Sequence, residues 1–255
     1  MTDLAGKVYV YGVIAASGDT APQVEGIEAA PVRLVGRPEL GALVSDLGTD
    51  ALSAPKAVRA HWRVLEEASQ DATIVPVRFG MVMESEDAVV ARLLEANQET
   101  LSALLHDVAG KVQLTVKGKY DEDRMLREIV QSTPAVAELN ERLRTVSVEA
   151  AYYDRIRLGE LVAEEVERRR LADTDQALRL LTPVAVEVSE QEVRTATAAF
   201  DLAFLVPRDG VEAFTKAVRA LDEAVGDRIA LSYVGPAPPY SFAEANLDQG
   251  SPAWA

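Results

Sequence analysis

The chain has 255 residues with 48% hydrophobic content, so it can bury a sizeable core as one large domain or two small ones, and we expect most of it to be ordered. Its formal net charge of −15 at pH 7 repels nucleic acid and anionic lipid, which argues against both as partners. The absence of cysteine excludes a disulfide framework, a thiolate nucleophile and a cysteine-based zinc site, and it is compatible with a reducing cytoplasm.

Three strand patterns precede the first helical pattern. Lys7 to Ile14 is rich in valine and tyrosine, which favour strands. The next two strand patterns, Val32 to Val35 and Leu40 to Leu47, are expected to pair with each other and are joined by the Gly36-Arg37-Pro38 turn. None of these stretches predicts a membrane span, because the first apolar run is too short, and we expect a soluble protein.

A helix is predicted next, with Ser53 as its N-cap, Pro55 in its first turn and an end near Asp71. The side chains expected on its buried face, spaced by three or four residues, are those of Val58, Trp62, Leu65 and Ser69.

The apolar run from Thr73 to Met83 predicts a strand. Pro76 lacks a backbone donor, so it must lie at an edge, a bulge or a bend. Arg78 is a cation within this run, and a buried cation must be paired or reach water. We expect Arg78 to pair with a carboxylate from a neighbouring helix or with backbone carbonyls at a bent strand.

A second helix is predicted from Ser85 to Gly110. One face of it carries a seam with coiled-coil-like spacing, formed by Val90, Leu94, Asn97, Leu101, Leu104 and Val108. We expect this seam to pack on a sheet of its own domain, and a contact between molecules is the alternative.

From Gly110 onward the order of patterns is strand, helices, strand, strand, helix, strand, which predicts a ferredoxin-like domain with an enlarged helical insertion in its first crossover. The expected strands are Val112 to Lys117, Val184 to Val188, Thr197 to Val206 and Ile229 to Val234. The expected helices are Glu122 to Val130, Ala135 to Arg144, Glu149 to Arg170, Asp175 to Leu181 and one that begins near Val211. The first half follows a modified version of this plan.

The predicted fold class is therefore α+β with two small domains. Residues 1–109 form an N-terminal α+β domain that ends in the long helix, residues 110–242 form the C-terminal ferredoxin-like domain, and residues 243–255 form a loose tail.

Catalytic chemistry is not indicated by any motif. Phosphate-binding glycine loops, the H-E-x-x-H helix and the G-x-S-x-G elbow are absent from the sequence. His61 and His106 have no nucleophile or second ligand at a recognisable spacing, and His106 is expected in the last turn of a helix. The acids from Asp121 to Asp123 are expected at a helix N-terminus, because the positions that follow do not match a calcium loop. We expect no cofactor, no metal and no catalytic residue.

Six segments, spread in order over nearly the whole chain, resemble those of a known family. They are YVYGVI (Tyr9 to Ile14), His61 with VLE (Val64 to Glu66), IVPVRFGMVM (Ile74 to Met83), RIRLGELVAEEVERRR (Arg155 to Arg170), AAFDLAFLV (Ala198 to Val206) and GPAPPYSF (Gly235 to Phe242). In these segments the chain resembles the gas vesicle protein F/L family (GvpF/GvpL). The PVRFG and GP-x-PPYSF pieces are the more specific ones.

The resemblance implies a non-enzymatic accessory or minor structural protein of gas vesicles. Such a protein would bind the principal shell protein, prevent its aggregation, and assist nucleation and assembly, in the cytoplasm and in association with the vesicle. Other gas vesicle accessory proteins are further expected partners, whereas nucleic acid and lipid membranes are not. The motif positions expected to serve the fold or a partner contact are His61, Pro76, Arg78, Phe79, Gly80, Gly235, Pro236, Pro238, Pro239, Tyr240 and Phe242.

The mechanism we expect is that an apolar groove or a sheet edge binds the shell subunit, by strand addition or by accepting its amphipathic helix. One alternative is a small-molecule-binding or catalytic ferredoxin-like protein that uses His61 and nearby carboxylates. Another is a homomeric scaffold built through the seam from Val90 to Val108.

Overall fold

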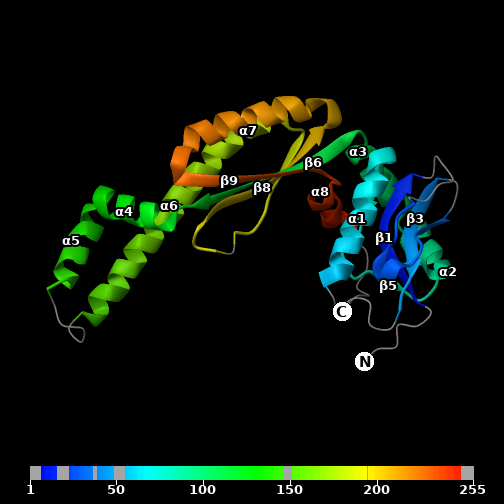
Figure 1. The fold of residues 1–255 in the computed structure, drawn as a ribbon, viewed down its shortest axis with the longest axis horizontal. Coiled ribbons are helices and arrows are strands. Elements are labelled where there is room, and N and C mark those ends of the chain that lie inside the picture. Colours follow the sequence, from blue (N-terminus) through cyan, green and yellow to red (C-terminus); the bar gives the residue numbers. More distant parts are fainter. Residues whose placement is uncertain are drawn as a thin grey trace. The chain divides into compact units, whose positions relative to one another are not determined.

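The chain is folded around two antiparallel sheets, each with its own hydrophobic core, in a mixed α+β fold (Figure 1). The structure is a computed structural model that describes residues 7–15, 23–36, 39–48, 55–145, 151–193 and 195–247. Unit 1 comprises residues 1–113 and 235–255, and unit 2 comprises residues 114–234. Ser53, Arg37 and Pro38, named above at a predicted cap and turn, lie outside the described residues.

This division differs from the predicted one at its second boundary. The chain returns to unit 1 at residue 235, whereas the sequence pattern placed residues 235–242 in the C-terminal domain. The segment after residue 242 is also folded as far as it is described, because helix α8 (Tyr240–Leu247) buries Phe242 and Ala243 in unit 1. The prediction of a loose tail from Ala243 is therefore wrong for residues 243–247.

The sheet of unit 1 has the strand order β2-β3-β1-β4, with β5 also paired to β1. Its strands are β1 (Val8–Ala15), β2 (Arg33–Gly36), β3 (Leu40–Asp46), β4 (Ile74–Pro76) and β5 (Val82–Met83). As predicted, three strands precede the first α-helix, and only the short 3-10 turn η1 (Ile27–Ala29) stands between β1 and β2.

A β-bulge in β1 decides which side chains face each layer. Val10 pairs with Val44 and Gly12 pairs with Leu43, so Tyr11 is the extra residue. The alternation of side chains shifts there by one position. A side chain at Gly12 would crowd the sheet, because its Cβ would lie 2.9 Å from the carbonyl oxygen of Val75.

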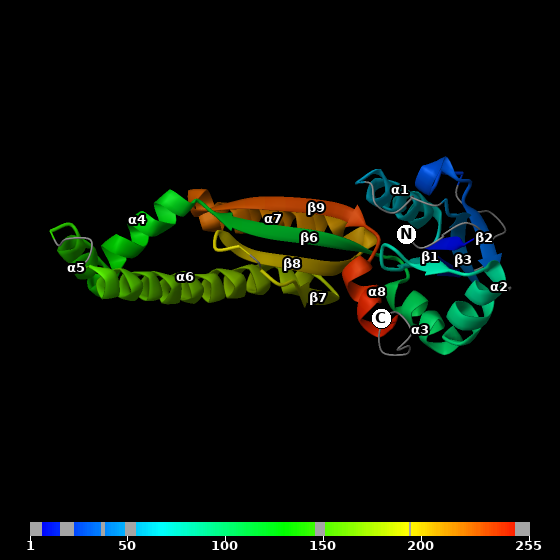
Figure 2. The ribbon, with the colours of Figure 1, turned by 90° about the horizontal axis from the view of Figure 1, so that it is seen from below.

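Helices cover both faces of this sheet (Figure 2). Helix α1 (Pro55–Asp71) packs on the face that carries Tyr9 and Tyr11. Helices α2 (Glu86–Ala88) and α3 (Gln98–Val108), with the π-helical segment η2 (Val89–Glu95) between them, cover the opposite face.

The buried face of α1 is rotated from the predicted one. Its buried residues are Ala57, His61, Val64, Leu65 and Ala68. The predicted Val58 is instead 40% exposed. The small residues Ala57 and Ala68 gave a weak hydrophobic signal, which explains why the pattern pointed to Val58.

The predicted long helix is interrupted at Asn97. The side-chain amide of Asn97 donates to the carbonyl oxygens of Arg92 (3.0 Å) and Leu93 (2.9 Å), which closes the π-helical segment before α3 begins. Leu101 and Leu104 pack on the sheet of their own unit. A homomeric scaffold built through this seam is therefore contradicted.

The predicted strand from Thr73 to Met83 is also wrong in part. β4 ends at Pro76, and the chain turns at Gly80, whose φ of +96° favours glycine, before β5 resumes the pairing with β1. Pro76 does end an edge strand, as predicted. Arg78 lies in the turn. Its side chain is exposed and takes part in an interaction.

Unit 2 contains a four-stranded sheet with the order β7-β8-β6-β9. Its strands are β6 (Lys111–Tyr120), β7 (Glu187–Glu190), β8 (Ala198–Pro207) and β9 (Ile229–Ala237). Its helices are α4 (Glu122–Ser132), α5 (Pro134–Leu143), α6 (Tyr152–Leu181) and α7 (Val211–Val225). Three 3-10 turns, η3 (Thr182–Val184), η4 (Arg208–Gly210) and η5 (Gly226–Arg228), join them.

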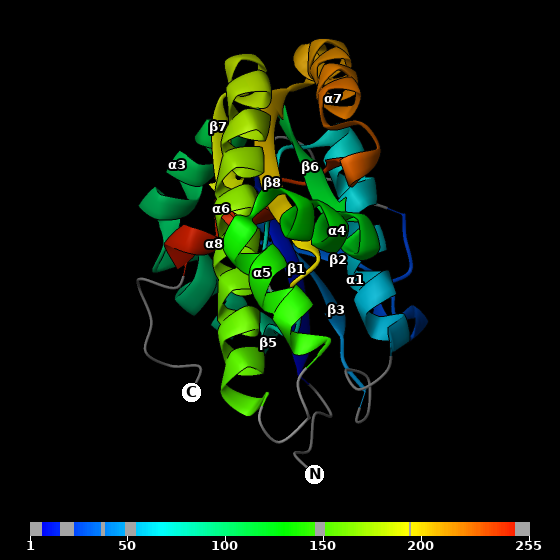
Figure 3. The ribbon, with the colours of Figure 1, turned by 90° about the vertical axis from the view of Figure 1, so that its left-hand side faces the viewer.

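One face of this sheet carries the core, on which α6 and α7 pack (Figure 3). Leu114 and Val116 of β6 point into this core, whereas Lys117 and Lys119 are exposed, because successive side chains of a strand point to opposite faces. α6 is one continuous helix where the sequence predicted two. No described helix is both long and apolar enough to cross a membrane.

Candidate functional site

The two most specific motifs, PVRFG and GPAPPYSF, meet in unit 1 beside α1. The backbone N–H of Phe79 donates to the hydroxyl oxygen of Tyr240 over 3.3 Å. The ring of Tyr240 packs on that of Trp62, with centroids 5.2 Å apart. The motif residues therefore form one contact cluster, although more than 150 positions of sequence separate them.

The closing motif is fixed by its prolines and by helix α8. The carbonyl oxygen of Pro239 accepts hydrogen bonds from the N–H groups of Phe242 and Ala243, both at 3.2 Å. The side chains of Pro238 and Pro239 are buried, whereas Gly235 and Pro236, joined by a cis peptide bond, are exposed. α8 packs against β4 and α3, so it covers the β4 edge of the sheet.

His61 belongs to a buried polar network under this cluster. The hydroxyl of Tyr9 lies 2.9 Å from His61 Nδ1, and it accepts a hydrogen bond from the N–H of Gly80 over 3.1 Å. The Tyr9 proton is thus free to be donated to Nδ1, which places the imidazole proton on Nε2. Nε2 is buried, and no described group meets it with good hydrogen-bond geometry.

The electrostatics of the network favour its neutral forms. Burial lowers the pKa of His61 to about 4, and the backbone of Val77 opposes that lowering only in part. Burial also raises the pKa of the Tyr9 hydroxyl, and the hydrogen bond from Gly80 acts in the opposite direction. A neutral imidazole with no exposed surface serves packing and hydrogen bonding, and its ring cannot reach a substrate in this arrangement.

The sequence did not single out two partners of this network. Tyr11 and Ser45 are both fully buried, and their hydroxyl oxygens lie 2.8 Å apart. The alternation YVYG placed Tyr9 and Tyr11 on one face of a strand, which was the available signal. This signal alone did not predict the network, because the network also depends on where α1 places His61. The His61 ring stacks on that of Tyr11 with centroids 5.8 Å apart.

A second charged cluster lies in unit 2 and is structural. Asp173 of α6 is buried, accepts a hydrogen bond from Tyr120 over 2.8 Å and pairs with Arg228 over 3.0 Å. Glu165 is also buried, and the hydrogen bond from Arg168 lowers the pKa of its carboxyl. The stretch of α6 from Glu164 to Arg170, which is rich in glutamate and arginine, is therefore not solvated throughout.

The four sheet edges differ in how well they are protected against further pairing. In unit 1, the β4 edge is covered by α8, and β2 is short and carries Arg33. In unit 2, β7 is short and carries two glutamates, whereas β9 runs from Ile229 to Ala237 without a charged residue. Charges, short length and proline are common protections of an edge, and β9 has only Pro236, near its end, so its edge from Ile229 to Val234 is the least protected.

The acidic and histidine side chains that the structure describes do not gather into a metal site. Within the described ranges, no group of three or more histidine, aspartate and glutamate side chains could hold a metal ion. Asp121 acts as the N-cap of α4, where it accepts a hydrogen bond from the N–H of Arg124 over 2.9 Å, as its predicted position required. His106 likewise lies in the last turn of α3, as predicted.

The family model described as "Gas vesicle synthesis protein GvpL/GvpF" matches residues 7–244. The chain belongs to this family. It is 32% identical over 241 residues to gas vesicle protein F of Streptomyces sp. (strain CB03234), which covers 93% of this chain and 100% of that protein. It is 26% identical over 253 residues to gas vesicle protein L1 of Halobacterium salinarum, with 92% and 89% covered.

Two crystal structures of the GvpL/GvpF family share the fold. The gas vesicle protein GvpF from Microcystis aeruginosa superposes with a TM-score of 0.79 at 24% identity, and it covers 94% of this chain and 100% of its own. GvpF from Anabaena sp. PCC7120 gives a TM-score of 0.80 at 24% identity, with 94% and 99% covered. The family expected from the sequence motifs is thereby confirmed, and so is a role related to gas vesicles.

Proposed function

We propose that this chain is an accessory or minor structural protein of gas vesicles, which binds the principal shell protein, prevents its aggregation, and assists nucleation and assembly. Family membership carries this proposal, because the family model matches residues 7–244. The proposed site of action is the cytoplasm, in association with the gas vesicle, and other accessory proteins are further proposed partners. The chemistry of the described residues fits a non-enzymatic role, since the one buried histidine is packed within a core.

The surface we propose for the shell subunit is the outer edge of β9. Five of its nine residues are exposed, and Val234 is 55% exposed. Its backbone groups can hydrogen-bond an incoming extended segment, and the lack of charge beside them suits an apolar partner. An apolar subunit held in this way would not associate with other copies through the same strand.

We further propose that unit 2 is a ferredoxin-like domain with an enlarged first crossover. The strand order β7-β8-β6-β9, with α4, α5 and α6 between the first two strands in sequence, supports this assignment. The sheet of unit 1 has its strands in the corresponding order, β2-β3-β1-β4, with the η1 turn where a first crossover helix would stand.

Co-expression of the principal shell protein with and without this chain tests the proposal. We expect the shell protein to remain in the supernatant and to co-purify with this chain. Unchanged solubility together with no co-purification would contradict the function.

A pair of matched variants tests the surface. Ser232 is exposed on β9, and Ser102 is exposed on α3. Ser232→Lys places a charge on the open edge and should reduce co-purification, because lysine protects edge strands against pairing. Ser102→Lys makes the same change of charge on a helix and should leave co-purification unchanged. Equal behaviour of the two variants would rule out the β9 edge while leaving the function itself standing.

A further inference from the structure

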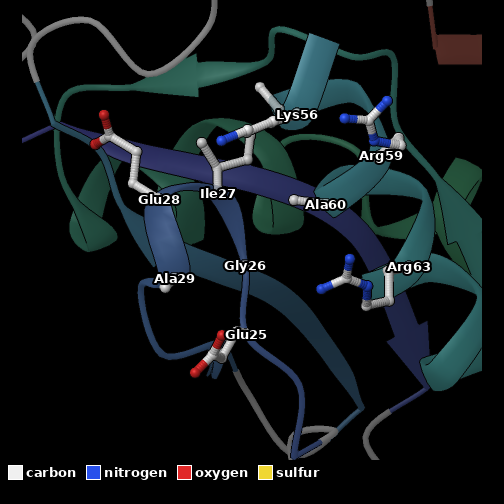
Figure 4. A pocket seen from close by; sticks show the side chains of 10 residues that line it. Glu25, Gly26, Ile27, Glu28, Ala29, Lys56, Arg59, Ala60 and Arg63 are labelled. Atoms are coloured by element: carbon white, nitrogen blue, oxygen red, sulfur yellow. The ribbon is translucent and has the colours of Figure 1, made fainter. Parts of the chain in front are cut away.

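An open cleft of about 530 Å³ lies in unit 1, between α1 and the turn that contains η1 (Figure 4). It is lined by residues 25–29 and by Lys56, Ala57, Arg59, Ala60 and Arg63 of α1. A volume of this size is in the range of binding sites, and it is distinct from the β9 edge and from the buried network around His61.

The turn that forms one wall is fixed in an uncommon conformation. Glu28 and Ala29 have φ angles of 56° and 57°, which cost non-glycine residues roughly 1–2 kcal/mol each. The turn is closed by a hydrogen bond from the N–H of Gly26 to the carbonyl oxygen of Ala30, at 2.9 Å. The N–H of Ile27 donates to the buried hydroxyl of Tyr11 over 2.8 Å. The wall is therefore tied to the core of the unit.

Small residues keep the cleft open. Ala29 lies on the turn, and Ala57 and Ala60 belong to α1, which forms the other wall. At Gly26 a Cβ atom would collide with the hydroxyl oxygen of Tyr11, so the close approach of the turn to the core requires glycine there. The void thus follows from the residue types along both walls.

The helical wall presents a row of cations. Lys56, Arg59 and Arg63 are spaced at i, i+3 and i+7, so they lie on the cleft side of α1 over a length of roughly 10 Å. None of the three forms an ion pair with a described residue, although the chain carries 41 acids against 26 lysines and arginines. Elsewhere the arginines are commonly paired, as Arg33 is with Asp46 over 2.7 Å.

The turn that forms the opposite wall contributes two acids, Glu25 and Glu28, but the carboxylate of Glu28 lies beside Gly48. A Cβ added at Gly48 would meet that carboxylate. Figure 4 shows the three cations on α1 and the side chains of Glu25 and Glu28 on the turn. The α1 wall is thus a local positive strip on a chain with a net charge of −15.

We propose that this cleft binds an acidic peptide segment of a partner protein. A row of cations along a helix matches a row of carboxylates, whereas a single phosphate group would require donors that converge on one point. The net negative charge of the chain disfavours a polyanion as long as a nucleic acid. This inference does not rest on shell-protein binding at β9, and its test contains no shell protein.

Fluorescence anisotropy tests it with a labelled peptide of about eight consecutive glutamates and with the matched glutamine peptide. The full chain should bind the glutamate peptide and not the glutamine peptide, and the affinity should fall as salt rises. Arg59→Glu with Arg63→Glu should weaken binding by at least about tenfold. Arg127→Glu with Arg219→Glu makes the same change of charge on exposed residues of unit 2 and should change it less than about twofold.

A second variant separates the cleft from its charge. Ala60→Met fills the cleft without altering any charge and should also weaken the binding of the glutamate peptide. Circular dichroism confirms that each variant is folded. Three results would overturn the proposal: no binding by the full chain, equal loss in both arginine double variants, or displacement of the peptide by inorganic phosphate more effectively than by sodium chloride at the same ionic strength.

Discussion

Lowering the pH should destabilise the protein through His61 by an amount that can be worked out. The pKa of His61 is about 4 in the folded state, against the ordinary histidine value of 6.5 that applies to the unfolded chain. The unfolded chain therefore binds more protons than the folded one between these values. The free energy of unfolding must fall as the pH drops through this window, and above about pH 6.5 the contribution is constant.

The magnitude follows from the pKa difference. At about pH 5 the unfolded imidazole is almost fully protonated, whereas the folded one is mostly neutral. The linkage relation then gives a loss of about 2 kcal/mol between about pH 7 and about pH 5. This is a large part of the stability of an ordinary domain, so the transition should move visibly in urea.

The assay is urea unfolding followed by circular dichroism at several pH values, for the natural chain and for His61→Asn. Asparagine offers Tyr9 an acceptor oxygen near the position of Nδ1 but does not titrate. Carboxyls such as Glu165, whose pKa the hydrogen bond from Arg168 lowers, also lose stabilisation as the pH falls. That loss is common to both proteins and cancels in their difference. If the two stabilities fall in parallel from about pH 7 to about pH 5, the argument that His61 is buried in its neutral form is refuted.

Three further changes test other contacts by urea or thermal unfolding. Gly26→Ala should cost about 2 kcal/mol through its collision with a buried hydroxyl, whereas Gly159→Ala, whose Cβ meets nothing, should be neutral or stabilising; similar effects would contradict the geometry of the turn. Arg228→Ala should cost about 2–3 kcal/mol, because buried Asp173 loses its cation, and a change within about 0.5 kcal/mol would show that the pair is solvated. Asn97→Ala should cost about 1–2 kcal/mol, since two carbonyls lose their donor, and no loss would mean that water replaces the amide.

The sequence predicted strands β1, β6 and β8 well because their signals are local, whereas the strand expected at Val184 to Val188 is shifted to Glu187–Glu190. Alternation in β6 and the valine- and tyrosine-rich β1 depend on residues that are neighbours along the chain. β8 was predicted within one residue at each end, since its apolar run is bounded by clear polar segments. Helix α7 was also found, from the regular spacing of its buried side chains, such as Phe214 and Val218.

The errors share a different cause, which is that a distant partner decides the local structure. Asn97 has an ordinary position in a helical pattern, and only its two bonds to carbonyl oxygens reveal where the helix changes type. The run around Arg78 has the apolar content of one strand. It is divided because the N–H of Gly80 bonds to Tyr9 and the N–H of Phe79 bonds to Tyr240. Tyr9 and Tyr240 lie far from this run in the sequence, so the residues of the run alone do not reveal these hydrogen bonds.

Apart from Gly235 and Pro236 at the end of β9, the motif residues lie away from the proposed binding surfaces, and the physical reason is their residue types. Phe242, Pro238 and His61 are buried, so they identify the family through the packing of unit 1. A partner instead needs exposed groups whose interactions are incomplete. The uncharged edge of β9 and the cations that line the α1 cleft are exposed groups of this kind, and no specific sequence motif marks them. Substitutions in the motif cluster should therefore act mainly on stability, while substitutions on these two surfaces should act on partner binding in a protein that stays folded.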